Sequence, residues 1–170
     1  MEKKKILIVD DDIDVITIIK TILESEGFEV ISASNKVEGI QKAKEHKPAL
    51  AILDVMMTTH FEGFELAKEL YEESSLKNMP RLMQTSIEVL PTNNQDVISM
   101  ARELRKNPEY RELEVLLIED PKTRKAGIDY RTKDGKNVWV PVDGFVAKPA
   151  DSKKVLPEVK RLLQKYKIIS

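Results

Sequence analysis

The chain has 170 residues, 41% of them hydrophobic, and its 28 basic and 29 acidic side chains give a formal net charge of −1. This length favours a single domain over residues 1–170 with a substantial core, and the balanced charge gives no sign of a nucleic-acid or membrane partner. The lack of cysteine excludes disulfides and thiolate chemistry, and no apolar run approaches the ~20 residues of a membrane span, so we expect a cytoplasmic protein.

The predicted elements alternate between strands and helices along the chain. Apolar and β-branched runs predict strands at residues 4–9, 28–34, 49–55, 80–86 and 143–149. Apolar residues at helical spacing predict helices at residues 14–27, 35–48, 62–74, 94–107 and 152–166. This alternation predicts an α/β fold, a doubly wound five-stranded parallel sheet with helices on both faces.

Polar side chains follow several predicted strands at the carboxyl edge, where such sheets bind their ligands. Asp10 and Asp11 follow the first strand and Asp54 follows the core of the third. Thr85 stands at the end of the fourth strand and Lys148 at the end of the fifth. Carboxylate oxygens suit Mg²⁺, while a hydroxyl and an ammonium group suit phosphoryl oxygens. The sequence therefore predicts one polar site built from these residues.

Four motifs give the chain a resemblance to a known family, the receiver domains of bacterial two-component response regulators. The motifs are VDD at residues 9–11, LDVMM at 53–57, TS at 85–86 and KP at 148–149, each after the expected strand. The resemblance implies a flavodoxin-like sheet with strand order 2-1-3-4-5. It also implies that Asp54 accepts a phosphoryl group from a sensor histidine kinase or a phosphotransfer protein, and that the signal passes to an unidentified downstream protein.

The resemblance also implies roles for the other residues of the site. Mg²⁺ would be held by the carboxylates of Asp10, Asp11 and Asp54 and by the backbone carbonyl of Met56. Thr85 and Lys148 would contact the phosphoryl group, and the Lys148–Pro149 peptide bond would be cis. Phe145 matches the switch aromatic of the family, although it fits a plain core position equally well. The output surface would then combine the fourth helix, the fifth strand and the last helix.

Two stretches depart from the family pattern. In the loop after Asp54, Thr58 replaces the usual proline, and His60 is either a tuning residue or a solvated loop histidine. The interval between Thr85 and Lys148 is far longer than one helix and two loops need. We place an insertion at about residues 105–141, between the fourth helix and the fifth strand, with a hairpin turning at 134–135. It is either a surface embellishment or a docking element, since Trp139 and Tyr130 look exposed in sequence.

Plain structural readings compete with these assignments. Asp10–Asp12 could be a solvated turn with helix caps, and we assign Asp12 alone to such a turn. Thr85 could simply begin a loop, and Lys148 could be a surface lysine. Three functions remain: a stand-alone phosphorylated receiver, a phosphorylation-independent pseudo-receiver that binds through its insertion, and a phosphatase of the haloacid dehalogenase type. The last lacks the residues expected after Asp12, so we rank it below the others.

Overall fold

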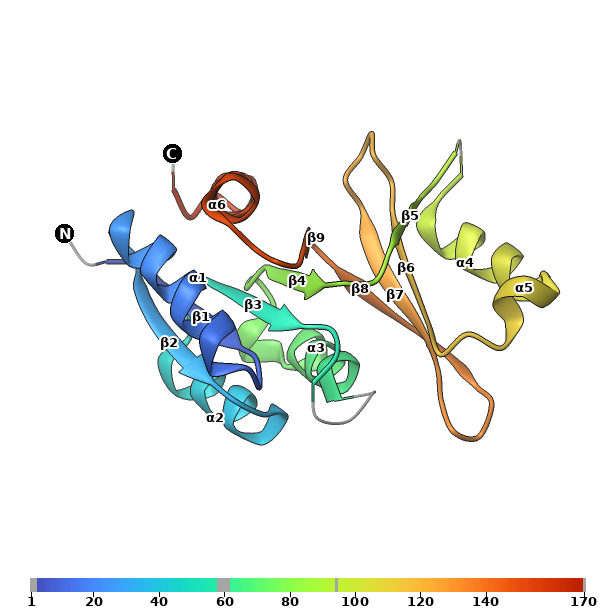
Figure 1. Ribbon diagram of the computed structural model, residues 1–170, viewed down its shortest axis with the longest axis horizontal. Coiled ribbons are helices and arrows are strands. Elements are labelled where there is room, and N and C mark those ends of the chain that lie inside the picture. Colours follow the sequence, from blue (N-terminus) through green and yellow to red (C-terminus); the bar gives the residue numbers. More distant parts are fainter. Residues whose placement is uncertain (1–2, 58–61, 94, 170) are drawn as a thin grey trace.

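The computed structural model describes residues 3–57, 62–93 and 95–169, which form a five-stranded parallel sheet and a second, four-stranded sheet (Figure 1). The parallel sheet consists of β1 Lys5–Val9, β2 Glu29–Ala33, β3 Leu50–Asp54, β4 Arg81–Thr85 and β9 Gly144–Ala147. Its helices are α1 Ile13–Ser25, α2 Lys36–His46, α3 Glu62–Glu72 and α6 Ser152–Lys165, with a short 3₁₀ helix η1 at Ser74–Leu76. The strand order β2-β1-β3-β4-β9 confirms the predicted 2-1-3-4-5 arrangement.

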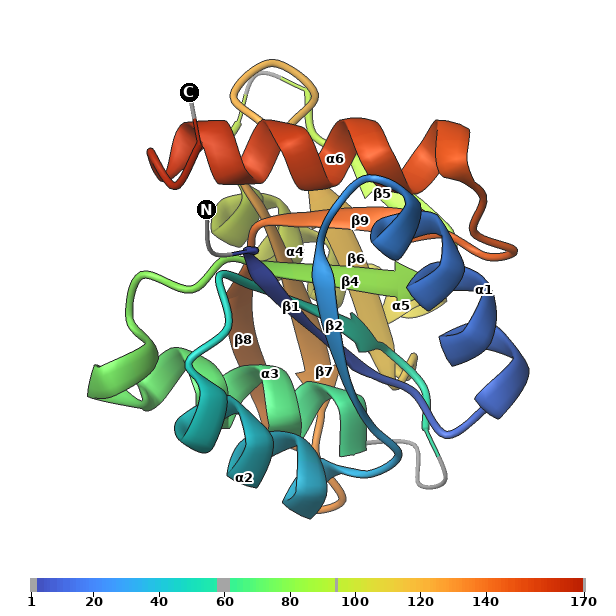
Figure 2. The same ribbon diagram turned by 90° about the vertical axis from the view of Figure 1, so that its left-hand side faces the viewer.

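The helices of the parallel sheet cover its two faces, as predicted (Figure 2). On one face, α1 and α6 bury a core with the alternate strand residues Ile6, Ile8, Leu50, Ile52, Leu82 and Val146. On the other face, α2 and α3 pack on the intervening residues, among them Leu7, Val9, Ala51, Leu53 and Met83. Both faces are apolar, which is why the strands are near-continuous hydrophobic runs.

The second sheet lies between β4 and β9 in the chain. It consists of β5 Val89–Pro91, β6 Val115–Glu119, β7 Ala126–Arg131 and β8 Asn137–Val142, in that spatial order. The connection from β5 to β6 holds α4 Val97–Lys106 and α5 Pro108–Arg111. The predicted hairpin is present, because β7 and β8 pair antiparallel and Gly135 takes a positive φ of 83° in the turn.

The position of α4 corrects the sequence-based prediction. We expected this helix to cover the parallel sheet and the insertion to begin near residue 105. Instead, the apolar face of α4, with Val97 and Ala101, packs on Leu116 and Ile118 of the second sheet. Because β5 is a strand of the added sheet and α4 packs on that sheet, the extra structure begins at β5, before residue 105.

The other face of the second sheet packs on the parallel sheet and α3, in the same core cluster. Leu117, Ile128 and Val140 contribute to this cluster, and the rings of Phe64 and Tyr130 stack with their centroids 5.4 Å apart. Tyr130 is therefore buried, and the half-buried Trp139 packs against the α4 side of the sheet. The expectation that these two aromatic residues are exposed for docking is wrong.

A buried ion pair holds α4 to the second sheet. The guanidinium of Arg105 donates to the carboxylate of Asp129 on β7 at 2.7 Å, and both side chains are less than a tenth exposed. Arg105 also donates to the carbonyl of Tyr110 at 2.9 Å, so it also fixes the α5 turn. Arg105 and Asp129 thus neutralise each other, which is the condition for keeping such a pair inside a protein.

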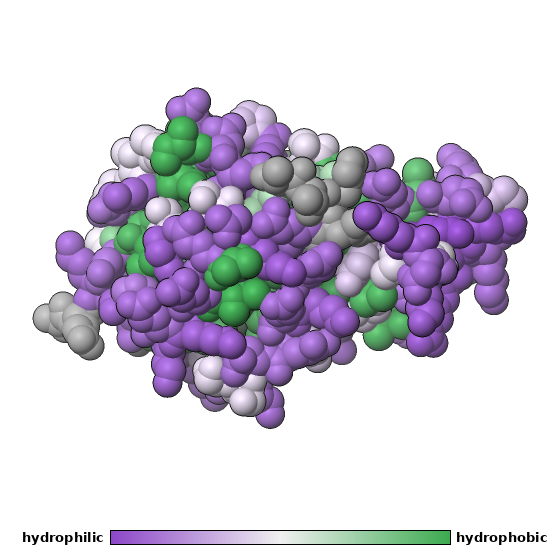
Figure 3. Space-filling view, turned by 90° about the horizontal axis from the view of Figure 1, so that it is seen from below, coloured by the Kyte–Doolittle hydropathy of each residue, from purple (hydrophilic) through white to green (hydrophobic). Residues whose placement is uncertain are grey.

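Among the described residues, a few large apolar side chains are exposed: Ile13, Ile18, Val37, Tyr71, Ile98 and Leu113. Ile18, Val37 and Tyr71 are more than half exposed. In the view of Figure 3, small apolar groups lie within a mainly hydrophilic face. Isolated residues of this kind are normal on protein surfaces. Among the described residues, no helix has the length and apolar character needed to cross a membrane.

Candidate functional site

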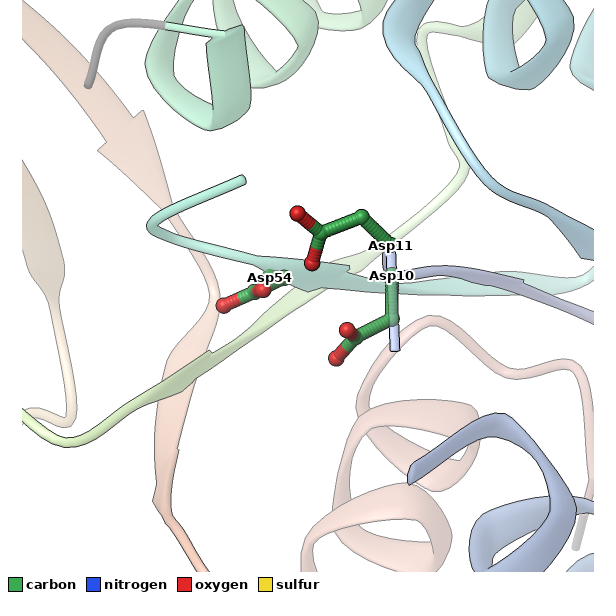
Figure 4. Close-up of side chains that lie close together, drawn as sticks. All are labelled: Asp10, Asp11 and Asp54. Carbon is green, nitrogen blue, oxygen red and sulfur yellow. The ribbon is translucent and has the colours of Figure 1, made fainter. Parts of the chain in front are cut away.

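Three carboxylates meet at the carboxyl edge of the parallel sheet (Figure 4). Asp10 and Asp11 directly follow β1, and Asp54 is the last residue of the neighbouring strand β3. One oxygen from each carboxylate lies within 4.8 Å of the others. Asp10 and Asp54 are buried, whereas Asp11 is exposed, so the group is accessible from solvent through Asp11.

Backbone amides hold the two buried carboxylates in place. The N–H of Asp12 donates to Oδ1 of Asp10 at 2.9 Å, and the N–H of Met56 donates to Oδ1 of Asp54 at 3.2 Å. Asp12 itself caps α1 by accepting from the N–H of Asp14 at 2.9 Å, in agreement with the turn reading of this residue.

Lys148 directly follows the edge strand β9 and brings a positive charge to the carboxylates. Its Nζ lies 3.0 Å from Oδ1 of Asp54 and 3.3 Å from Oδ2 of Asp10. The backbone N–H of Lys148 donates to the carbonyl of Thr85 at 2.8 Å, and the Lys148–Pro149 bond is cis, as the resemblance implies. The ammonium group is thus fixed between the two buried acids.

Burial and mutual repulsion shape the charges of the site. Burial, followed by repulsion from Asp10, raises the pKa of Asp54 to about 6, although Lys148 opposes the shift. Burial also raises the pKa of Asp10. Burial works against the charge of Lys148, but its hydrogen bond to Asp54 and the charge of the acids together raise the pKa of the ammonium. Burial therefore disfavours the ionised forms of Asp10 and Asp54, and the positive charge of Lys148 offsets this only in part.

Thr85 and Phe145 lie beside this cluster in a cleft of about 480 Å³ that Lys148 also lines. The Thr85 hydroxyl accepts from the N–H of Ile87 at 2.8 Å, and the Phe145 side chain is half-buried. The cleft also contains Glu119, which comes from the second sheet. Sequence reasoning missed Glu119, because its place in the cleft depends on how the added sheet packs.

The donor set fits a hard divalent cation. All three acidic side chains offer oxygen, and Oδ2 of the fully buried Asp10 has no hydrogen-bond partner among the described residues. Oxygen ligands with open positions are what Mg²⁺ prefers. The role of the Met56 carbonyl stays a prediction, and Thr58 and His60 lie outside the described residues.

Comparison with known proteins identifies the family to which this chain belongs. Residues 6–102, more than half of the chain, match the model of the response regulator receiver domain. The chain is 40% identical over 83 residues to the alkaline phosphatase synthesis transcriptional regulatory protein PhoP of Bacillus subtilis, an alignment that covers 49% of this chain and 33% of that protein. It is 43% identical over 82 residues to the transcriptional regulatory protein CpxR homolog of Haemophilus influenzae, covering 48% and 34%. The chain thus spans about a third of the length of these curated relatives.

Solved structures show the same fold. A CheY-like response regulator receiver domain protein from Methanospirillum hungatei superposes with a TM-score of 0.61 at 22% identity, covering 98% of both chains. The chemotaxis response regulator CheY4 of Vibrio cholerae gives a TM-score of 0.59 at 22% identity, covering 95% of this chain and 100% of that one. Together with the matched residues and the acidic cluster, these findings show that the chain belongs to the response regulator receiver domain family.

Proposed function

We propose that this chain is a cytoplasmic phosphorylation switch in which Asp54 accepts a phosphoryl group from a sensor histidine kinase or a phosphotransfer protein. The observation that supports this most strongly is the cluster of Asp10, Asp11 and Asp54 with the Lys148 ammonium 3.0 Å from Asp54. An oxygen of Asp54 forms the new bond to phosphorus as the phosphorus–nitrogen bond of phosphohistidine breaks, and the imidazole nitrogen keeps the electron pair. Such transfers need positioning and charge balance more than covalent help.

The acids would hold Mg²⁺ through Asp10, Asp11 and Asp54, with the Met56 carbonyl completing the protein ligands. When bound, the ion supplies the positive charge that lets a phosphoryl group approach three carboxylates. The residues themselves are already gathered within 4.8 Å, and the backbone donors at Asp12 and Met56 fix two of them. This preorganisation limits the rearrangement that binding requires.

Lys148, Thr85 and Phe145 would respond to the new group. The phosphoryl group adds roughly −1.5 to −2 charges, which favours moving Lys148 from the carboxylates to the phosphoryl oxygens. The Thr85 hydroxyl lies 3.5 Å from the carbonyl of Ile87, a weak contact that it can exchange for a phosphoryl oxygen. Phe145 lines the same cleft, so a change at Thr85 alters its surroundings and shifts the population of the surface that a downstream protein binds.

Phosphorylation with a small phosphodonor tests this proposal. We expect acetyl phosphate and Mg²⁺ to give a base-labile adduct of one phosphoryl group, and Asp54→Asn to abolish it. A native protein that forms no adduct would instead support the pseudo-receiver, in which the second sheet binds a partner without phosphorylation. Rapid turnover of phosphate monoesters would support a phosphatase.

A further inference from the structure

Gln84 is a buried polar residue that the proposed reaction does not use. It lies in β4, is 0% exposed, and neither the nitrogen nor the oxygen of its amide has a hydrogen-bond partner among the described residues. Buried amides are nearly always hydrogen-bonded, because leaving them unpaired disfavours the folded state. An amide left without partners at this position therefore calls for a ligand or an ordered water.

The register of the sheet places Gln84 beside the phosphoacceptor. Gln84 is the direct neighbour of Asp54 on one side and of Val146 on the other. Side chains alternate between the faces of a strand, and Val146 and Leu82 belong to the core under α1 and α6. Gln84 therefore shares a face with Asp54, one strand away from it.

Asp10 completes the same row of side chains. It directly follows Val9, the last residue of β1 and the neighbour of Leu53, so Asp10 lies on the side of Asp54 away from Gln84. Oδ2 of Asp10 also lacks a hydrogen bond: Nζ of Lys148 is 3.3 Å away, but not in hydrogen-bond geometry. Polar atoms without a hydrogen-bond partner among the described residues, in the amide of Gln84 and at Oδ2 of Asp10, thus lie on both sides of Asp54.

We propose that Gln84 is a positioning residue of the phosphoacceptor site, whose amide binds a buried water that supports the carboxylate of Asp54. A buried water makes two to four hydrogen bonds to otherwise unpaired polar groups, and the two amide atoms together with a neighbouring carboxylate oxygen supply them. The water keeps Asp54 in the orientation that meets the cation and the phosphoryl group. The proposal rests on the proposed function of Asp54.

Gln84→Met tests the role, because methionine keeps the length of the side chain and removes the amide. We expect the thermal stability of the metal-free variant to be unchanged or higher, since a buried amide that has to hold an ordered water is replaced by an apolar side chain. We expect its affinity for Mg²⁺ to fall about tenfold, as is typical when the outer partner of a metal ligand is removed. The rate of phosphorylation by acetyl phosphate at subsaturating Mg²⁺ falls with it.

Leu82→Met is the matched control. It introduces the same residue on the same strand and face, two positions from Gln84, and swaps one apolar side chain for another of similar volume. We expect its Mg²⁺ affinity to equal that of the native protein. A Gln84→Met variant that binds Mg²⁺ and reacts like the native protein would overturn the proposal, and so would one that loses stability but keeps its Mg²⁺ affinity.

A second measurement examines the water itself. In the native protein, nuclear Overhauser contacts from the Gln84 side-chain N–H groups to a long-lived water are expected, and their absence would contradict the proposal. Failure here is distinguishable from failure of the proposed function. If the native protein binds Mg²⁺ but takes no phosphoryl group, the function is wrong, while the Mg²⁺ affinities of the two variants still decide the role of Gln84.

Discussion

Replacing the phosphoacceptor by its neutral isostere should stabilise the metal-free protein at neutral pH. The pKa of Asp54 is raised from 3.8 to about 6, so ionising this side chain costs about 3 kcal/mol more in the folded protein than in the unfolded chain, at about 1.36 kcal/mol per pH unit. The folded state holds the proton more tightly. The free energy of unfolding therefore falls as the pH rises from about 4 to about 6, and stays lower above that.

Asp54→Asn carries no charge at any pH and escapes this loss. The variant should exceed the native protein by up to about 3 kcal/mol in unfolding free energy at pH 7.5 and match it at pH 4. Asp54 is only 4% exposed, so solvent screens little of the effect. Lys148 keeps Asp10 as a partner 3.3 Å away in the variant.

Urea unfolding in EDTA, followed by circular dichroism at both pH values, measures the difference. Asp134→Asn is the control, because Asp134 is an exposed acid in the β7–β8 turn, where Asn before Gly135 is well tolerated. If the native protein and Asp54→Asn were equally stable at pH 7.5, burial and the charge of Asp10 would not disfavour the ionised form of Asp54. An equal gap at pH 4 and 7.5 would refute the electrostatic origin.

Three further changes follow from the described contacts. Mg²⁺ at a hundred times its dissociation constant should stabilise the native protein by about 2.7 kcal/mol, and Asp11→Asn should lose most of this in a thermal melt; an equal gain in both proteins would place the ion elsewhere. Arg105→Met should destabilise by about 3–5 kcal/mol, because it leaves the buried Asp129 uncompensated; urea unfolding with little loss would show that the pair is solvated. Gly127→Ala should cost about 1–3 kcal/mol, since a Cβ there would lie 2.1 Å from the Trp139 ring; a melting temperature equal to that of the native protein would mean that the ring moves freely.

The candidate site was the most predictable part of the molecule. Apolar runs marked the strands, and the carboxyl ends of parallel strands lie at one edge, so Asp10, Asp54 and Lys148 had to approach one another once the strand order was right. The electrostatic balance was less accessible. How far the pKa of Asp54 moves depends on burial and on distances that no spacing in the sequence contains.

The second sheet was only partly predictable, for identifiable reasons. The hairpin turn at Gly135 has a strong local signal, whereas β5 is three residues long and ends in Pro91, which argues against a strand. The helical pattern of α4 was correct, but an apolar face built on Val97 and Ala101 fits either sheet. The partner of a helix is decided by the whole fold, so this error could not have been avoided from periodicity alone.

The two sheets share a hydrophobic core, so deleting the added segment would expose apolar residues of the parallel sheet. The family match ends at residue 102, inside α4, yet β6, β7 and β8 supply Leu117, Ile128 and Val140 to the cluster that covers β4 and α3. Excising these strands would strip an apolar face of the parallel sheet and leave Phe64 without its stacking partner. In this chain the family-sized portion and its addition share one hydrophobic core, so a shortened version would need another element to cover that face of the parallel sheet.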